Sequence, residues 1–280
     1  MLALVANPEG STLLAMLALL LAIGAIAGVI AGLLGVGGGI VLVPAFYYAF
    51  SALGYESPRL MQICVATSLA TIVVTSIRSV LSHNRRGAVD WEILRGFAPG
   101  IVAGALLGLA VASSLRSREL MVVFGVIGVL IGLYLGFGRI RWKLGDAPPR
   151  GLGRLVLSFV TGFFSVLMGI GGGSFGVPIM TLYGVPIHRA VATAAGFGTI
   201  IAIPSVIGFL MLPVPPEWRP PFTIGHVNIA AFAIVVAMTT LTAPLGVRLA
   251  HAMDPKPLRR AFAVFIILMA LNMLRKAFMG

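Results

Sequence analysis

Charged residues are scarce in this sequence. Only 10% of its 280 residues are Asp, Glu, Lys or Arg, whereas 59% are hydrophobic, and the mean hydropathy is +1.06. A soluble domain keeps about a quarter of its residues charged. Because no soluble fold of this size hides so much apolar surface, lipid must cover it. The composition therefore predicts an all-α polytopic membrane protein.

Acidic residues are rarer than basic residues. Eight Asp and Glu stand against 20 Lys and Arg, which gives a formal net charge of +12. The basic residues lie mostly in short gaps between apolar runs, where the positive-inside bias explains them better than nucleic-acid binding does. No carboxylate falls in the middle of an apolar run, and proton relays and carboxylate-coordinated cation sites usually need one. The sequence thus argues against a nucleic-acid partner and against cation transport.

Cysteine is nearly absent too. The single Cys64 lies in an apolar run, so it has no partner for an intrachain disulfide or a zinc site, and we expect a small buried side chain. The N-terminal segment lacks the positive region of a secretory signal, so the first apolar run is expected to be a retained span. No bound cofactor is implied.

Apolar runs make up most of the chain. A span needs about 20 apolar residues, and eight stretches qualify: 12–34, 60–82, 93–113, 119–138, 152–170, 190–212, 226–247 and 258–274. Two shorter runs follow glycine clusters and are expected to be broken or re-entrant half-helices: 40–50 and 174–184. The longest polar gap divides the chain into a first transmembrane repeat, a cytoplasmic linker and a second transmembrane repeat: 1–138, 139–153 and 154–280.

The two halves resemble each other at their glycine clusters. The segment Gly35-Val36-Gly37-Gly38-Gly39, with Pro44 after it, matches Gly169-Ile170-Gly171-Gly172-Gly173, with Pro178 after it, at one offset of 134 residues. A weaker match joins Ala66-Thr67-Ser68 to Ala192-Thr193-Ala194. This pattern predicts an internal repeat.

The basic residues indicate how the repeats are oriented. If each short run counts as a return crossing, 13 Lys and Arg gather on one side against 6 on the other, in the gaps 83–95, 139–154, 184–189 and 248–260. The positive-inside rule favours this arrangement. It gives five passes per half, so the repeats are expected to be inverted, with both termini outside.

The glycine clusters are candidates for an anion site. Three glycines at membrane depth expose backbone groups, which is tolerated only inside protein or beside a cavity. A cluster followed by a short helix offers free N–H groups and the positive end of a helix dipole, and paired clusters point to a transporter site. The alternative is close helix packing through small residues, which we expect for single glycines such as Gly104 and Gly132.

These segments resemble the TauE/SafE family of sulfite exporters, also called the toluene sulfonate uptake permeases. The run Gly169-Ile170-Gly171-Gly172-Gly173-Ser174-Phe175-Gly176-Val177-Pro178 is the strongest match. The resemblance implies a bacterial inner-membrane permease for sulfite, sulfonates or related sulfur-containing anions. The sequence departs from the family at Ala194, where many members have a hydroxyl residue.

The expected substrate-binding set joins the glycines to nearby polar side chains: Gly37, Gly38, Gly39, Gly171, Gly172, Gly173, Ser174, Thr67, Ser68, Thr193, Arg78 and His188. The hydroxyl groups either bind the oxyanion or bond back to the preceding helical turn. Arg78 either attracts the anion or snorkels to lipid headgroups, and His188 is either a ligand or an interfacial histidine.

Further expectations concern substrate, mechanism and partners. The substrate is a small, sulfur-containing oxyanion, and the inside-negative membrane potential is expected to drive its efflux at about 2.3 kcal/mol per charge per 100 mV. An anion channel with the same site is the nearest alternative. A second alternative is an intramembrane serine hydrolase, because Gly172-Gly173-Ser174-Phe175-Gly176 fits the nucleophile-elbow pattern and His188 offers a base. The apolar faces contact lipid and permit a homodimer.

Overall fold

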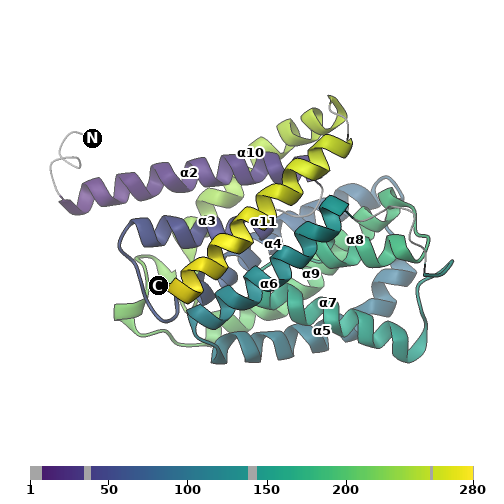
Figure 1. Ribbon diagram of the computed structural model, residues 1–280, viewed down its shortest axis with the longest axis horizontal. Helices are drawn as coiled ribbons and strands as arrows, with labels where there is room; N and C mark the ends of the chain where they lie inside the picture. The colour runs from purple at the N-terminus through teal and green to yellow at the C-terminus, as the bar shows by residue number, and fades with distance from the viewer. Residues whose placement is uncertain (1–7, 35–38, 138–143, 253–254, 280) are drawn as a thin grey trace.

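The computed structural model describes residues 8–34, 39–137, 144–252 and 255–279, and they form a bundle of α-helices (Figure 1). Eight helices are long: α2 Pro8–Leu34, α4 Leu60–Asn84, α5 Trp91–Ser114, α6 Ser117–Phe137, α7 Gly151–Met168, α9 Ile187–Met211, α10 Ile229–Ala252 and α11 Pro255–Met279. Two are short: α3 Gly39–Ala52 and α8 Gly173–Leu182.

The helices confirm a multi-pass membrane protein. Seven of the long helices are long and apolar enough to cross a bilayer, and the eighth, α2, has an apolar stretch at Leu14–Ile30. The two short helices begin where the glycine clusters end, as expected. Each also contains the proline that follows its glycine cluster, Pro44 in α3 and Pro178 in α8.

Two expected boundaries are corrected. The span expected at 226–247 begins only at Ile229, because Val227–Asn228 forms strand β2, which pairs antiparallel with β1, Thr223–Ile224. Asn228 then caps α10, its side-chain oxygen accepting a hydrogen bond from Ala231 N–H at 2.8 Å. Helix α7 begins at Gly151, so the last residues of the expected linker 139–153 are helical.

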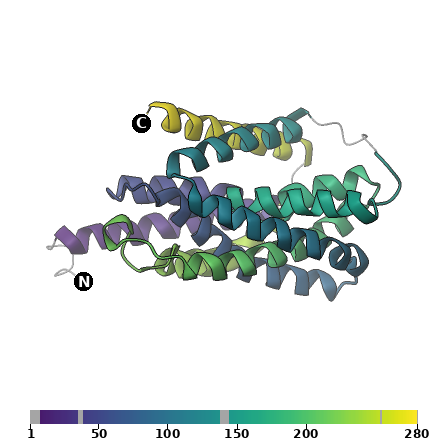
Figure 2. The same cartoon turned by 90° about the horizontal axis from the view of Figure 1, so that it is seen from below.

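Helix pairs organise the bundle. Helix α2 packs along α10, α5 along α7 and α6 along α11, while α4 and α9 pair between them. Figures 1 and 2 both show α6 and α11 side by side, and the start of α2 and the end of α11 lie toward the same end of the molecule. Helix α4 is the most enclosed span, since every residue from Leu60 to Ile72 is buried.

Single glycines allow these pairs to approach closely. A Cβ atom at Gly104 of α5 would overlap the Phe159 carbonyl group of α7, and one at Gly132 of α6 would lie 2.5 Å from the Ile267 side chain of α11. Small residues at such crossings let helix backbones approach closely. Helix packing, the role expected for these two glycines, is therefore confirmed.

Polar contacts define the two ends of the bundle. At one end, which we call the Asp90 face, Asp90 before α5 contacts Arg189 at the start of α9. At the other, which we call the Arg59 face, Arg59 before α4 donates to the Leu115 carbonyl after α5 at 3.2 Å. The 3₁₀ turn η1, Pro216–Trp218, also lies at the Arg59 face, where the Trp218 carbonyl accepts a hydrogen bond from Ser57.

Candidate functional site

The second glycine cluster is a buried break between α7 and α8. Gly169 ends α7 with φ +62°, a left-handed conformation that favours glycine. Its N–H bonds the Val166 carbonyl at 3.0 Å, and Ile170 N–H bonds the Ser165 carbonyl at 2.9 Å. This hydrogen-bond pair is a Schellman motif, so the chain leaves α7 sharply and starts α8 within a few residues.

The two glycine clusters meet at this break. A Cβ atom at Gly39, the first residue of α3, would lie 2.8 Å from the Gly169 carbonyl oxygen and 3.0 Å from Ile170 Cα. The Ser68 hydroxyl of α4 donates a hydrogen bond to the same Gly169 oxygen at 2.7 Å. Gly37 and Gly38 lie outside the described residues. The structure therefore brings Gly39, Ser68 and the second cluster together.

Close contact with α9 accounts for part of the second glycine cluster. A Cβ atom at Gly172 would overlap Phe197 and lie 3.0 Å from Gly198 N, whereas one at Gly171 would meet Ile72 at an ordinary 3.4 Å. Gly172 thus has a packing role whatever else it does. Gly171 and Gly173 are buried, and Gly173 begins α8.

Unpaired hydrogen-bond donors lie on the three helices that meet at the break, α7, α8 and α9. Among the described residues, no partner lies within reach of the hydroxyl groups of Ser165, Ser174 and Thr199, all of which are buried. In the part of the chain that the structure describes, the N–H groups of Gly173, Ser174 and Phe175 also have no acceptor, whereas Gly176 N–H bonds the Gly172 carbonyl at 2.7 Å. Each unpaired buried polar group costs about 1–3 kcal/mol. Donors without acceptors, gathered at one helix N-terminus, are what a small anion binds.

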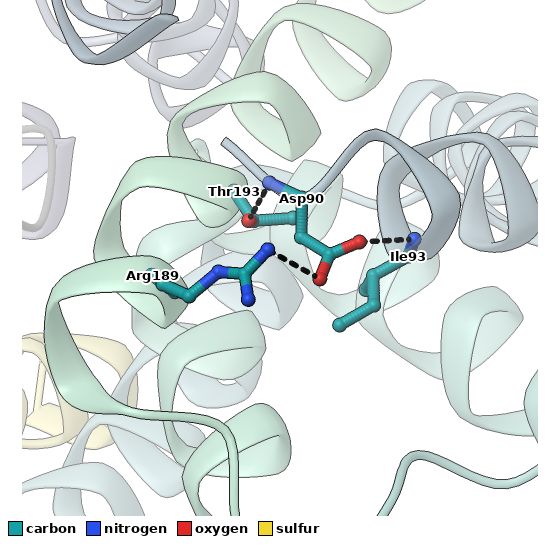
Figure 3. Close-up of polar contacts among 4 residues, drawn as sticks. All are labelled: Asp90, Ile93, Arg189 and Thr193. Atoms are coloured by element: carbon teal, nitrogen blue, oxygen red, sulfur yellow. Dashed lines mark hydrogen bonds and ion pairs between the residues drawn. The ribbon is translucent and has the colours of Figure 1, made fainter. Parts of the chain in front are cut away.

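Thr193 holds the start of α5 rather than facing this break. Its hydroxyl accepts a hydrogen bond from Asp90 N–H at 2.9 Å (Figure 3). Asp90 in turn caps α5, accepting from Ile93 N–H at 3.1 Å, and lies 3.2 Å from the Arg189 guanidinium. The contacts with Thr193 and Arg189 join the start of α5 to α9 at the Asp90 face.

Thr67 makes the equivalent contact at the opposite end of the bundle. Its hydroxyl accepts from Asn228 N–H at 3.0 Å, and Asn228 caps α10. Both threonines, predicted to bind substrate, thus have structural partners.

Arg78 lies in the last two turns of α4, and His188 lies in the first turn of α9. Both side chains are exposed. Arg78 donates to the Thr240 hydroxyl of α10 at 3.0 Å. His188 has no hydrogen-bond partner among the described residues, and it lies beside Arg189 at the Asp90 face. The structure does not bring either side chain to the glycine break.

The sequence of this chain is similar to those of known membrane proteins. The model of the sulfite exporter TauE/SafE family matches residues 20–273. The chain belongs to the TauE/SafE family. A relative from Haemophilus influenzae is 29% identical over 260 residues, covering 92% of this chain and 98% of its own. A second, from Methanocaldococcus jannaschii, is 28% identical over 263 residues, covering 93% and 96%. Both are described as a "probable membrane transporter protein", so a membrane transporter is the shared description.

Sequence reasoning missed the two capping residues, Asp90 and Asn228. A signal for them exists in the turns that precede α5 and α10, which read Gly87-Ala88-Val89-Asp90 and Gly225-His226-Val227-Asn228. In both turns the glycine has positive φ and the last residue caps a helix. A short polar residue before an apolar run is an ordinary helix-start signal.

The nucleophile-elbow pattern at Ser174 has an unusual setting. The segment before it is helix α7, whereas the elbow follows a strand. In the described part of the chain no base contacts the Ser174 hydroxyl.

Proposed function

We propose that this protein carries a small sulfur-containing oxyanion, such as sulfite or an organosulfonate, and binds it at the break between α7 and α8. The observation that carries the proposal is the set of unpaired hydroxyl groups, Ser165 and Ser174 above all, beside the N-terminus of α8. An oxyanion supplies several acceptors to hydroxyl and N–H donors at once. The TauE/SafE family match supports the substrate class.

The site would be occluded in this conformation. Every residue from Gly169 to Ser174 is buried, so protein covers the start of α8. A carrier that alternates between two open states passes through such a state, whereas an open channel would expose the site. This burial favours a carrier over the alternative of an anion channel.

Two inverted repeats, each with four long helices and one half-helix, would supply the two open states. Exchanging the halves converts the α2–α10 pair into α7–α5 and leaves α4–α9 and α6–α11 paired. Individual contacts follow the same exchange: Gly28 packs on Thr239, and Gly162 packs on Ile101. The capping contacts of Thr67 and Thr193 are a further matched pair. Rocking of one repeat against the other is the usual motion of such transporters.

The Asp90 face would be cytoplasmic in the inner membrane, because it carries the larger share of basic residues. Arg78 and His188 would then help to raise the local anion concentration near that face rather than coordinate the substrate. The membrane potential would favour efflux without a coupling ion.

Counterflow in proteoliposomes tests the proposal. Proteoliposomes that contain the purified protein and are loaded with unlabelled sulfite should accumulate labelled sulfite. Ser174→Ala should lower the rate of this uptake at least about tenfold, because it removes one charge-assisted hydrogen bond to the substrate. Ser205→Ala is the matched control, because Ser205 is also a buried serine but its hydroxyl already donates to the Ile201 carbonyl at 2.7 Å. Equal rates for both variants and wild type would refute a substrate role for Ser174. Strict dependence on Na⁺ or a proton gradient would refute potential-driven efflux.

A further inference from the structure

An open cavity of about 620 Å³ lies at the Arg59 face, and none of its lining residues belongs to the glycine break. Its wall is more apolar than polar and is formed mostly by the chain after α9, including Pro213, Pro215, Pro216 and Trp218, with Arg59, Ser113 and His226 as its polar residues. Ligand pockets for drug-sized molecules span about 300–1,000 Å³. The cavity is therefore large for an inorganic oxyanion and has room for an organic body.

The chain segment that builds this cavity has no equivalent in the first half. Helices α4 and α5 are joined by residues 85–90, whereas α9 and α10 are joined by the much longer 212–228. The turn before the next helix is otherwise alike: Ala88 N–H bonds the His83 carbonyl at 3.1 Å, and His226 N–H bonds the Phe209 carbonyl at 3.0 Å. Since a short turn suffices to join the helices, the added segment needs another explanation.

Arg59 provides a cation with unused donors. One terminal nitrogen, Nη1, donates to the carbonyl groups of Ser113 and Leu115, which end α5. Nε and Nη2 have no acceptor in the described part of the chain. A guanidinium with one free edge presents the planar pair of N–H donors that matches a carboxylate or sulfonate group.

His226 supplies a second polar group to the same cavity. The residue is only 4% exposed, and its ring packs against Phe209 with 5.6 Å between ring centroids. Its Nδ1 atom has no hydrogen-bond partner among the described residues. In the first half, Ala88 occupies the equivalent position of the turn, so the fold does not require a histidine here.

We propose that this cavity is a second binding site, for an organic anion whose acid group lies between Arg59 and His226. The apolar body of the ligand lies against Trp218 and the neighbouring prolines. Binding at this site stands on its own geometry, and only its role as a station on the transport path rests on the proposed function. The Arg59 face would be the outer face, so the cavity would hold substrate outside the occluded break.

Fluorescence of Trp218 reports on this site directly. With Trp91→Phe and Trp142→Phe introduced, Trp218 is the one tryptophan left in the chain. The probe is p-toluenesulfonate, added to the detergent-purified protein, and p-toluenesulfonamide is its neutral counterpart. Saturable quenching by the anion, with binding at least tenfold weaker for the sulfonamide, is the expected result. Equal binding of the two would overturn the proposal.

Variants of the two polar residues complete the test. His226→Leu and Arg59→Lys should each weaken p-toluenesulfonate binding about tenfold, because each removes a donor to the acid group. Arg118→Gln is the control, since Arg118 lies over Phe278 and does not line the cavity. Unchanged binding in His226→Leu, which replaces a buried ring by an apolar side chain, would overturn the proposal even if Arg59→Lys failed to fold.

The variant Ser174→Ala distinguishes the proposed site at the glycine break from the proposed site at the Arg59 face. Quenching of Trp218 that persists in Ser174→Ala, while counterflow is lost, supports two distinct sites. If wild-type protein shows quenching but no counterflow of any anion, the transport proposal fails and the outer site stands. If Ser174→Ala abolishes quenching, the cavity is not an independent site.

Discussion

Asp90 offers the sharpest test of the contacts that join the two halves. Its counterpart before α10 is Asn228, which caps its helix in the same way but has no charge. Replacing Asp90 by Asn therefore converts one contact into the form that the chain already uses at the other end. The substitution keeps the cap and removes only the attraction to Arg189.

The structure sets the size of the effect. The Arg189 side chain is 53% exposed and that of Asp90 22%, so their ion pair is screened by solvent and is worth about 0.2–1 kcal/mol. A helix cap of this kind is worth about 1 kcal/mol, and Asn caps as well as Asp. Asp90→Asn should thus cost less than about 1 kcal/mol, whereas Asp90→Ala should cost about 1–3 kcal/mol because it loses both terms. The Thr193 hydrogen bond goes to the Asp90 backbone and survives both changes.

Equilibrium unfolding in detergent micelles measures these differences. Asp90→Asn, Asp90→Ala and Arg189→Gln are compared alone and in pairs, at low and high salt. The coupling between Asp90 and Arg189 should shrink at high salt, because screening weakens exposed charge pairs. If Asp90→Asn is as destabilising as Asp90→Ala, the cap is not the main contribution and the equivalence with Asn228 is wrong.

Three further predictions concern other sites. Gly172→Leu should abolish both the fold and binding, because even a Cβ atom there overlaps Phe197; a folded, active variant seen by size-exclusion chromatography and counterflow would contradict this. Ser174→Ala should leave the free energy of unfolding unchanged or raise it by up to about 1–3 kcal/mol, since it removes an unpaired buried hydroxyl; a clear loss of stability would show an unseen structural bond. Burial lowers the pKa of His226 below its ordinary 6.5, an effect partly offset by carbonyl groups of Phe209 and Leu212 and reinforced by Arg59. The unfolded chain therefore binds more protons below about pH 6.5, so stability should fall as the pH drops through that value, and His226→Gln should remove part of the slope in a pH series of melting curves.

Much of the fold could be predicted because lipid imposes simple rules. Long apolar runs must become helices, since every backbone group needs a partner in the bilayer, and each of the ten expected segments coincides with a helix over most of its length. Errors occur where local polar contacts decide, as at Val227–Asn228, which pairs as a strand although it reads as the start of a span.

The candidate site was less predictable than the fold. Ser174 and the glycine break were predicted as the site because three glycines at membrane depth are costly unless they have a use, and their role in binding stays a prediction. Thr67 and Thr193 were also expected there, since hydroxyl groups on apolar helices suit an oxyanion. Their actual partners are helix caps 161 and 103 residues away along the chain. Sequence periodicity alone does not pair residues so far apart.

The sequence by itself therefore determined that this protein lies in a membrane, where its spans are and where its helices break, because those depend on local composition. Only the tertiary structure decided which hydroxyl groups are already bonded and which are unpaired, because that depends on contacts between the halves. It also decided that Arg59 and His226 share a cavity: the first precedes α4 and the second precedes α10, and only the closed bundle brings them together.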